Sequence, residues 1–121
     1  MLLAGIAVAG ALGALARYLV DAFVIRRAIR GLPAATLAIN VSGSFVLGVL
    51  TGLALYHALP ATPKIILGTG FCGAYTTFST FAYEVVRLAE EREHRDAALT
   101  LALSLVVPGL VAALGLALAS L

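Results

Sequence analysis

Apolar residues fill long stretches of the chain, and charged residues interrupt them in only a few places. The charges gather between residues 17 and 30, at Lys64 and between residues 84 and 96. A helix needs about 20 residues to cross a bilayer core of about 30 Å, and the stretches between the charges have about this length. The pattern predicts four membrane-spanning helices, at approximately residues 2–24, 33–56, 65–88 and 97–120.

The arrangement of the apolar residues decides between helices and a barrel. They run continuously, without the alternation of a membrane β-strand, so helices are expected. Turn-forming Gly and Pro residues flank the second span at 31–33 and 59–63, and a charged loop at 90–96 precedes the fourth. We therefore predict an all-α membrane protein with a single four-helix domain over residues 1–121. An even number of spans places both termini on one side.

The composition supports this class and excludes others. The chain has 121 residues, of which 62% are hydrophobic and 12% charged, with a mean hydropathy of +1.07. Soluble domains are less apolar and more charged than this chain. Disordered chains are less apolar and more charged still. A net charge of +2 gives no support for a nucleic-acid partner. We expect a multi-pass protein of the plasma or inner membrane, with no cleaved signal peptide because no Lys or Arg precedes the first apolar run.

Small residues in the first span predict close helix packing. Gly5, Ala9 and Gly13 recur every four residues and lead to Arg17 on the same stripe. Arg17 lies one turn before Asp21. Its guanidinium can pair with that acid or reach the membrane surface, or it can attract an anion, and the sequence leaves these interpretations open.

The second span carries a polar face. Asn40, Ser44, Gly48 and Gly52 follow one another at intervals of four residues. The two glycines predict a packing seam. The Asn40 amide either links two helices through hydrogen bonds or donates to an anion that moves along the Ser44 face, and both interpretations stay open.

The third span combines glycines with hydroxyl residues between residues 68 and 81. This composition has poor helix propensity, so we expect the third helix to be broken near its middle. Freed backbone groups need protein or a cavity to satisfy them, and unwound carbonyls suit a small cation. Phe78 and Phe81 share a face, where they either pack against lipid or core or present their positive ring edges to an anion.

Pro108 in the fourth span removes the hydrogen bond to the carbonyl of Ser104. The result is either a simple kink or a polar patch that lines a path. The sequence shows no metal-ligand cluster, nucleophile–base pair or phosphate-binding loop, so we do not expect an enzyme. A compact four-helix bundle fills its own centre, and a transport function therefore implies an oligomer.

Three motifs together resemble a known family. They are GALGALARY at residues 10–18, NVSGSFVLG at 40–48 and GTGFCGAYTTFSTF at 68–81. In this order, and with this chain length, they resemble the signatures of the CrcB/Fluc fluoride channels.

The resemblance implies a passive, fluoride-selective channel that exports fluoride from the cytoplasm and relieves its toxicity. It also implies an antiparallel, dual-topology homodimer with a structural sodium ion (Na+) at its centre, held by the backbone carbonyls of Gly73 and Thr76. The expected fluoride path includes the Ser44 face of the second span. The resemblance adds to this path Arg17, Asn40, Phe78, Ser79, Thr80, Phe81 and Ser104.

Two other functions fit the size of the chain. A small four-helix multidrug or cation exporter needs a carboxylate within the membrane, whereas Asp21 and Glu84 are expected at helix ends. A non-transporting membrane scaffold explains the glycine seams but leaves Asn40 and the Thr/Ser/Phe cluster without a role.

The distribution of arginines bears on orientation. Three lie in the first loop (Arg26, Arg27 and Arg30) and three lie around the third loop (Arg87, Arg92 and Arg95), which shares its side of the membrane. This bias favours termini outside the cytoplasm, because Lys and Arg set topology. Either the bias is too weak to prevent insertion in both orientations, or the chain forms a heterodimer with an oppositely oriented paralogue.

Overall fold

The computed structural model describes residues 1–24 and 33–121, and the regular elements within these ranges are helical. Arg26, Arg27 and Arg30 lie outside the described residues. In chain order, with η marking a π-helix, the elements are α1 (Leu2–Leu19), η1 (Val20–Val24), α2 (Ala34–Tyr56), α3 (Ala61–Ile65), η2 (Ile66–Cys72), α4 (Gly73–Tyr75), α5 (Phe78–Glu90) and α6 (His94–Ala119).

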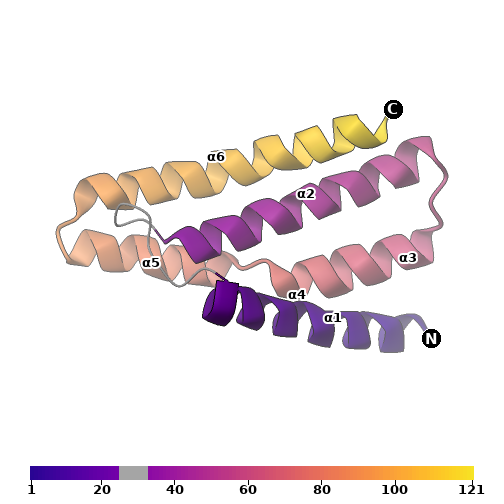
Figure 1. Cartoon of the computed structure of the whole chain (residues 1–121), viewed down its shortest axis with the longest axis horizontal. Coiled ribbons are helices and arrows are strands. Elements are labelled where there is room, and N and C mark those ends of the chain that lie inside the picture. The colour runs from indigo at the N-terminus through magenta and orange to yellow at the C-terminus, as the bar shows by residue number, and fades with distance from the viewer. Residues whose placement is uncertain (25–32) are drawn as a thin grey trace.

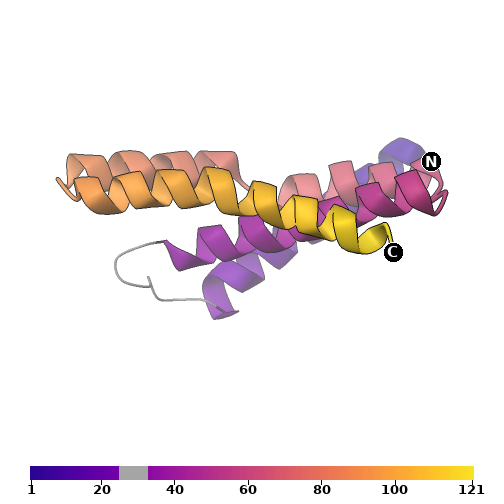
Figure 2. The ribbon, with the colours of Figure 1, turned by 90° about the horizontal axis from the view of Figure 1, so that it is seen from above.

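The helices form an elongated bundle in which the chain makes four passes along the long axis (Figure 1). Both termini lie at the end of the bundle that also holds the connection from α2 to α3, as an even number of passes requires (Figure 1). α2 packs along α6, and α1 packs against η2 and α4. α5 lies beside the first half of α6 (Figure 2).

The observed helices follow the predicted spans, with differences at their ends. The first span is helical over its predicted length, and the second begins at Ala34. The third pass begins at Ala61 rather than at residue 65 and continues to Glu90, whereas α6 begins at His94 rather than at residue 97. Charged residues therefore lie in helix ends rather than in a long loop. An acid in the first turn of α6 and an Arg in the last turn of α5 both suit the helix dipoles.

A tight turn joins α5 to α6. Arg92 adopts a left-handed conformation, with φ of 64°. The N–H of Glu93 donates to the carbonyl of Leu88 (2.9 Å), and that of Arg92 donates to the carbonyl of Ala89 (3.1 Å). These two bonds form a Schellman motif, which satisfies the last carbonyls of α5 and reverses the chain within a few residues.

Three of the described helices are long and apolar enough to cross a membrane, namely Leu2–Phe23, Ala34–Tyr56 and His94–Ala119. The third pass consists of shorter helical pieces and so has no single helix of that length. The chain is thus a multi-pass membrane protein in which one pass differs from the other three.

Glycines bring α2 and α6 into backbone contact. A Cβ atom on Gly48 would collide with the carbonyl of Ala112, and a Cβ on Gly115 would lie 2.6 Å from the carbonyl oxygen of Phe45. Each helix therefore presents a glycine to a carbonyl of the other. Gly52 meets α6 in the same way one turn further along, which confirms the predicted packing seam.

The small residues of the first span serve a second seam. Gly13 faces the backbone of Phe71, and a Cβ on Gly5 would lie 2.6 Å from Cδ1 of Ile66. In return, a Cβ on Gly70 would lie 3.0 Å from the Cβ of Ala9. α1 and η2 thus pack closely through small residues of both helices.

Gly48→Ala tests the seam between α2 and α6. The new methyl group must displace the backbone of α6, and overpacking of this kind costs about 1–3 kcal/mol. We expect a lower melting temperature in detergent, measured by loss of the monodisperse peak after heating. Gly109→Ala on α6 is the matched control, because nothing lies within 4 Å of its new Cβ. Equal stability of Gly48→Ala and the parent would contradict the packing described here.

Candidate functional site

The third pass breaks at two threonines. α4 ends at Tyr75, and Thr76 and Thr77 have extended backbones, with ψ values of 159° and 123°. α5 then begins at Phe78. This confirms the predicted break, but the glycines are not where it occurs. Gly68 and Gly70 lie inside η2, where they are buried against neighbouring helices, so their role is close packing.

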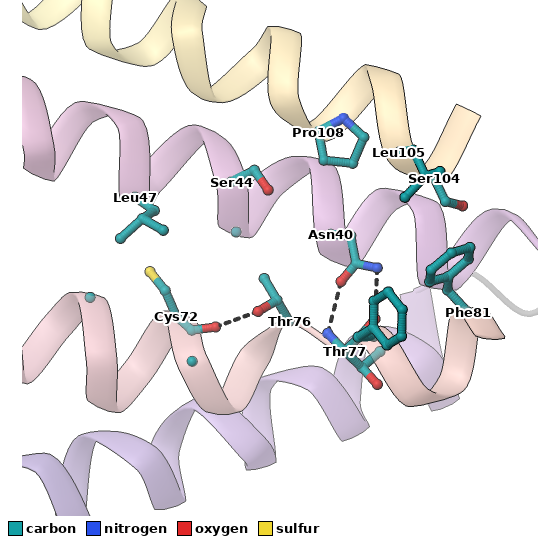
Figure 3. A pocket seen from close by; sticks show the side chains of 14 residues that line it. Asn40, Ser44, Leu47, Cys72, Thr76, Thr77, Phe81, Ser104, Leu105 and Pro108 are labelled. Atoms are coloured by element: carbon teal, nitrogen blue, oxygen red, sulfur yellow. Dashed lines mark hydrogen bonds between the residues drawn. The ribbon is translucent and has the colours of Figure 1, made fainter. Parts of the chain in front are cut away.

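The Asn40 side chain bridges the break. Its Nδ2 donates to the carbonyl of Thr77 (2.9 Å), and its Oδ1 accepts from the N–H of Thr77 (2.8 Å; Figure 3). The amide therefore replaces the helical acceptor that the Thr77 N–H loses and adds a second donor to the Thr77 carbonyl. This confirms that Asn40 links two helices. A second N–H on Nδ2 is left for another acceptor, because a primary amide carries two.

Thr77 also starts the next helix. Its Oγ1 accepts from the backbone N–H of Thr80 (3.2 Å) and donates to Oγ1 of Thr80 (3.0 Å). This is an N-cap, which satisfies a donor that has no partner within the helix. The sequence pattern had predicted no role for Thr77. A threonine followed three residues later by a second hydroxyl, ahead of an amphipathic stretch, was the available signal.

The break releases several carbonyl groups from helical hydrogen bonding, and two of them concern the candidate site. The N–H of Thr77 donates to Asn40 and that of Thr80 to Thr77 Oγ1, so neither reaches the carbonyl four residues earlier. Those carbonyls belong to Gly73 and Thr76. Nη1 of Arg17 donates to the Thr76 carbonyl (3.3 Å). Within the described residues no ion pair joins Arg17 to Asp21, so Arg17 serves the break instead.

One pocket lies directly beside the break. We call it the amide pocket; its volume is about 280 Å³. It collects seven of the residues that the sequence marked as candidates, from α2, the third pass and α6 (Figure 3). Its lining residues are Asn40, Gly43, Ser44, Leu47, Gly68, Cys72, Gly73, Thr76, Thr77, Phe78, Phe81, Ser104, Leu105 and Pro108.

A second pocket, which we call the arginine pocket, also has a volume of about 280 Å³. The α2 residues that line the arginine pocket are Thr36 and Ile39, whereas those that line the amide pocket run from Asn40 to Leu47. The two pockets therefore extend towards opposite ends of the bundle. Thr77 lines both pockets. The residues of the arginine pocket are Ala14, Arg17, Tyr18, Asp21, Thr36, Ile39, Thr77 and Thr80.

Ser79 lines neither pocket. Its hydroxyl lies 3.4 Å from Oγ1 of Thr77 and is exposed at the surface of α5. The structure thus divides the predicted residues between the amide pocket, the arginine pocket (Arg17 and Thr80) and the N-cap that separates them.

The two phenylalanines form an edge-to-face pair. The ring centroids of Phe78 and Phe81 are 5.1 Å apart, and the ring planes meet at 80°. Phe81 is buried, with 4% of its surface exposed, whereas Phe78 is 73% exposed. The edge-to-face arrangement leaves ring edges free to face a polar neighbour, and edges carry the positive part of the aromatic quadrupole.

The chain matches one protein-family model over most of its length. The family model described as "CrcB-like protein, Camphor Resistance (CrcB)" matches residues 4–116. The chain belongs to the CrcB family.

Curated relatives agree with this assignment. A protein of Leifsonia xyli subsp. xyli named fluoride-specific ion channel FluC 1 is 57% identical over 95 residues, covering 78% of this chain and 69% of its own. A FluC 2 protein of Mycolicibacterium paratuberculosis is 44% identical over 97% of this chain and 93% of its own. A FluC protein of Syntrophotalea carbinolica is 45% identical over 94% of both chains.

The fourth helix of this CrcB-family chain contributes a polar patch. α6 runs through Pro108 without interruption, so the proline does not end the helix. Pro108 and Ser104 both line the amide pocket. Because proline lacks an N–H, the Ser104 carbonyl has no donor from residue 108. Both residues thus lie beside a cavity, and their role as a polar patch that lines a path stays a prediction.

Glu84 lies deeper in its helix than the sequence predicted. We expected it near a helix end, but α5 continues to Glu90, so more than a turn of helix follows. Oε1 of Glu84 accepts from the hydroxyl of Thr36 on α2 (2.9 Å). Its Oε2 is buried, and no hydrogen-bond partner reaches it from the described residues. The link between Thr36 and Glu84 was missed because both residues read as ordinary helix positions.

Asn40→Ala tests the bridge across the break. The substitution leaves the N–H of Thr77 without a partner and removes one donor from its carbonyl, and an unsatisfied buried group costs about 1–3 kcal/mol. We expect a clear fall in melting temperature in detergent. Ser44→Ala is the stability control, since it removes a hydroxyl from the same face of α2 and the same pocket but touches no bond at the break. Equal melting of the two variants would contradict the bridging role.

Proposed function

We propose that this chain is the subunit of a passive, fluoride-selective channel that exports fluoride from the cytoplasm and relieves its toxicity. The observation that carries the proposal is the amide pocket, which gathers an amide, hydroxyls and aromatic rings beside a broken membrane helix. None of its lining residues is charged. The names of the curated relatives support the same ion.

The chemistry of the pocket suits fluoride. The ion is small and strongly hydrated, so a selective path must replace its water with compact donors. The free N–H of Asn40, the hydroxyls of Ser44 and Ser104, and the ring edges of Phe78 and Phe81 are donors of this kind. A fixed cation inside the amide pocket would bind the ion too tightly there, and conduction requires that the ion also leaves.

The arginine pocket supplies the other half of the proposed path. Arg17 carries a positive charge into this pocket, and a charge of that sign raises the local concentration of anions. Thr80 adds a hydroxyl to the same pocket, and Ser79 lies next to the N-cap. In this proposal fluoride crosses between the two pockets beside Thr77.

The two other functions are not favoured. A proton-coupled exporter would need an acid near the middle of its path. Glu84 lines neither pocket, and Asp21, which lines the arginine pocket, lies in η1 at the end of the first pass. A scaffold would need no polar cavity. An enzymatic function is not favoured either, because the named relatives are ion channels.

We also propose a structural sodium ion and an antiparallel homodimer. The carbonyls of Gly73 and Thr76 have lost their helical donors, and carbonyl oxygens suit a hard cation. In this proposal each chain gives two carbonyl oxygens, and a second, oppositely oriented copy would complete the oxygen ligands. Bound there, sodium would neutralise the facing carbonyl dipoles and hold the two breaks together.

Fluoride selectivity is tested in liposomes that contain the purified chain. We expect fluoride to leave much faster than chloride without a pH gradient, as followed with ion-selective electrodes. Phe78→Ile and Phe81→Ile should slow fluoride efflux strongly, because each removes a ring edge from the amide pocket. Phe71→Ile is the matched control, since Phe71 stacks on Tyr75 outside that pocket. Equal rates for fluoride and chloride, or a need for a proton gradient, would contradict the proposed function.

The orientation of the chain is tested by expressing it alone and labelling single cysteines with a reagent that does not cross membranes. Arg30→Cys places one in the loop predicted between the first two spans, and His57→Cys places one at the end of α2. We expect both to be labelled from outside, as insertion in two orientations requires. The parent is the control, because its cysteine, Cys72, is buried. Labelling of His57→Cys alone, with no fluoride efflux, would support the heterodimer instead.

A further inference from the structure

Thr100 is a buried hydroxyl residue without a hydrogen bond. It lies on α6 with 4% of its surface exposed, and no partner reaches its Oγ1 within the described parts of the chain. Other hydroxyls in the helices donate to the carbonyl four residues earlier, as Ser42 does to Ala38 (2.7 Å) and Thr51 to Leu47 (2.8 Å). An unpaired buried hydroxyl is costly, so this one calls for a partner.

Thr100 lines a small void between α2 and α6. The volume of the void is about 10 Å³. A cavity needs roughly this much space, about 10–15 Å³, to hold one water molecule. The void is therefore too small for any organic ligand. It is lined by Pro33, Leu37, Thr100, Leu103 and Ser104.

The chemistry around the void favours an occupant that accepts hydrogen bonds. Pro33 is the N-cap residue of α2 and makes no side-chain cap, so the void borders the positive end of a long helix. Ser104 adds a second hydroxyl, and it also lines the amide pocket. Ser104 therefore lies between an atom held by Thr100 and the amide pocket.

We propose that this void binds one small hydrogen-bond acceptor, a water molecule or a fluoride ion, to which the Thr100 hydroxyl donates its proton. The site rests on the burial of Thr100, its lack of a partner and the size of the void. It does not depend on which ion the channel conducts.

Thr100→Val and Thr100→Ser test the site. Valine keeps the shape and removes the hydroxyl, whereas serine keeps the hydroxyl and serves as the matched control. At a resolution that shows ordered water, we expect a density peak at hydrogen-bond distance, about 2.5–3.0 Å, from the hydroxyl oxygen in the parent and in Thr100→Ser. Thr100→Val should lack the peak. A parent structure without it would overturn the proposal.

Melting temperatures in sodium fluoride and in sodium chloride distinguish the two occupants. If fluoride fills the void, the parent gains more stability from fluoride than Thr100→Val does. If water fills it, the gain is the same for both. In either case Thr100→Val should melt at or below the parent. A higher melting temperature for Thr100→Val than for Thr100→Ser and the parent would overturn the proposal, because it would mean that the hydroxyl is an unsatisfied group in an empty void.

Discussion

The two hydrogen bonds between the Asn40 side chain and the Thr77 peptide hold the third pass in its broken form. An extended peptide at membrane depth has no water to bond to, so it persists only if protein supplies both a donor and an acceptor. A single primary amide does this for Thr77. Without the Asn40 amide, a continuous helix through residues 76–78 would be the conformation of lowest free energy.

Other features follow from that one link. Because the helix restarts at Phe78, the phenyl rings of Phe78 and Phe81 come to lie at the first turn of a new helix, next to Asn40. Because the chain is extended before this point, the carbonyls of Gly73 and Thr76 lose their helical donors, and Arg17 donates to that of Thr76. The glycine seams on both sides keep α2 on α6 and α1 on η2, and this packing holds Asn40 at the right depth to meet the break.

The sequence predicted the features that depend on local composition. Apolar runs of membrane-spanning length identified the four passes, and the glycine–hydroxyl segment indicated a break. The break lies near the middle of the predicted third span, as expected, but its exact residues depend on a bond between residues 37 positions apart in the chain. Helix propensity marked the whole segment from residue 68 to residue 81, whereas packing against α1 keeps Gly70 helical. The pairing of Thr36 with Glu84 was hidden for the same reason, since it joins two helices.

Thr77 is shared by two cavities that extend towards opposite ends of the bundle. When water fills both cavities, the electrical potential inside each cavity stays close to that of the solution on its side. The transmembrane voltage then falls mainly across the layer between the two cavities. Thr77 forms part of that layer, because it lines both cavities. A charge that crosses there moves through much of the transmembrane field. Changes to the wall at Thr77 should therefore alter how ion flow depends on voltage more than changes anywhere else along the bundle.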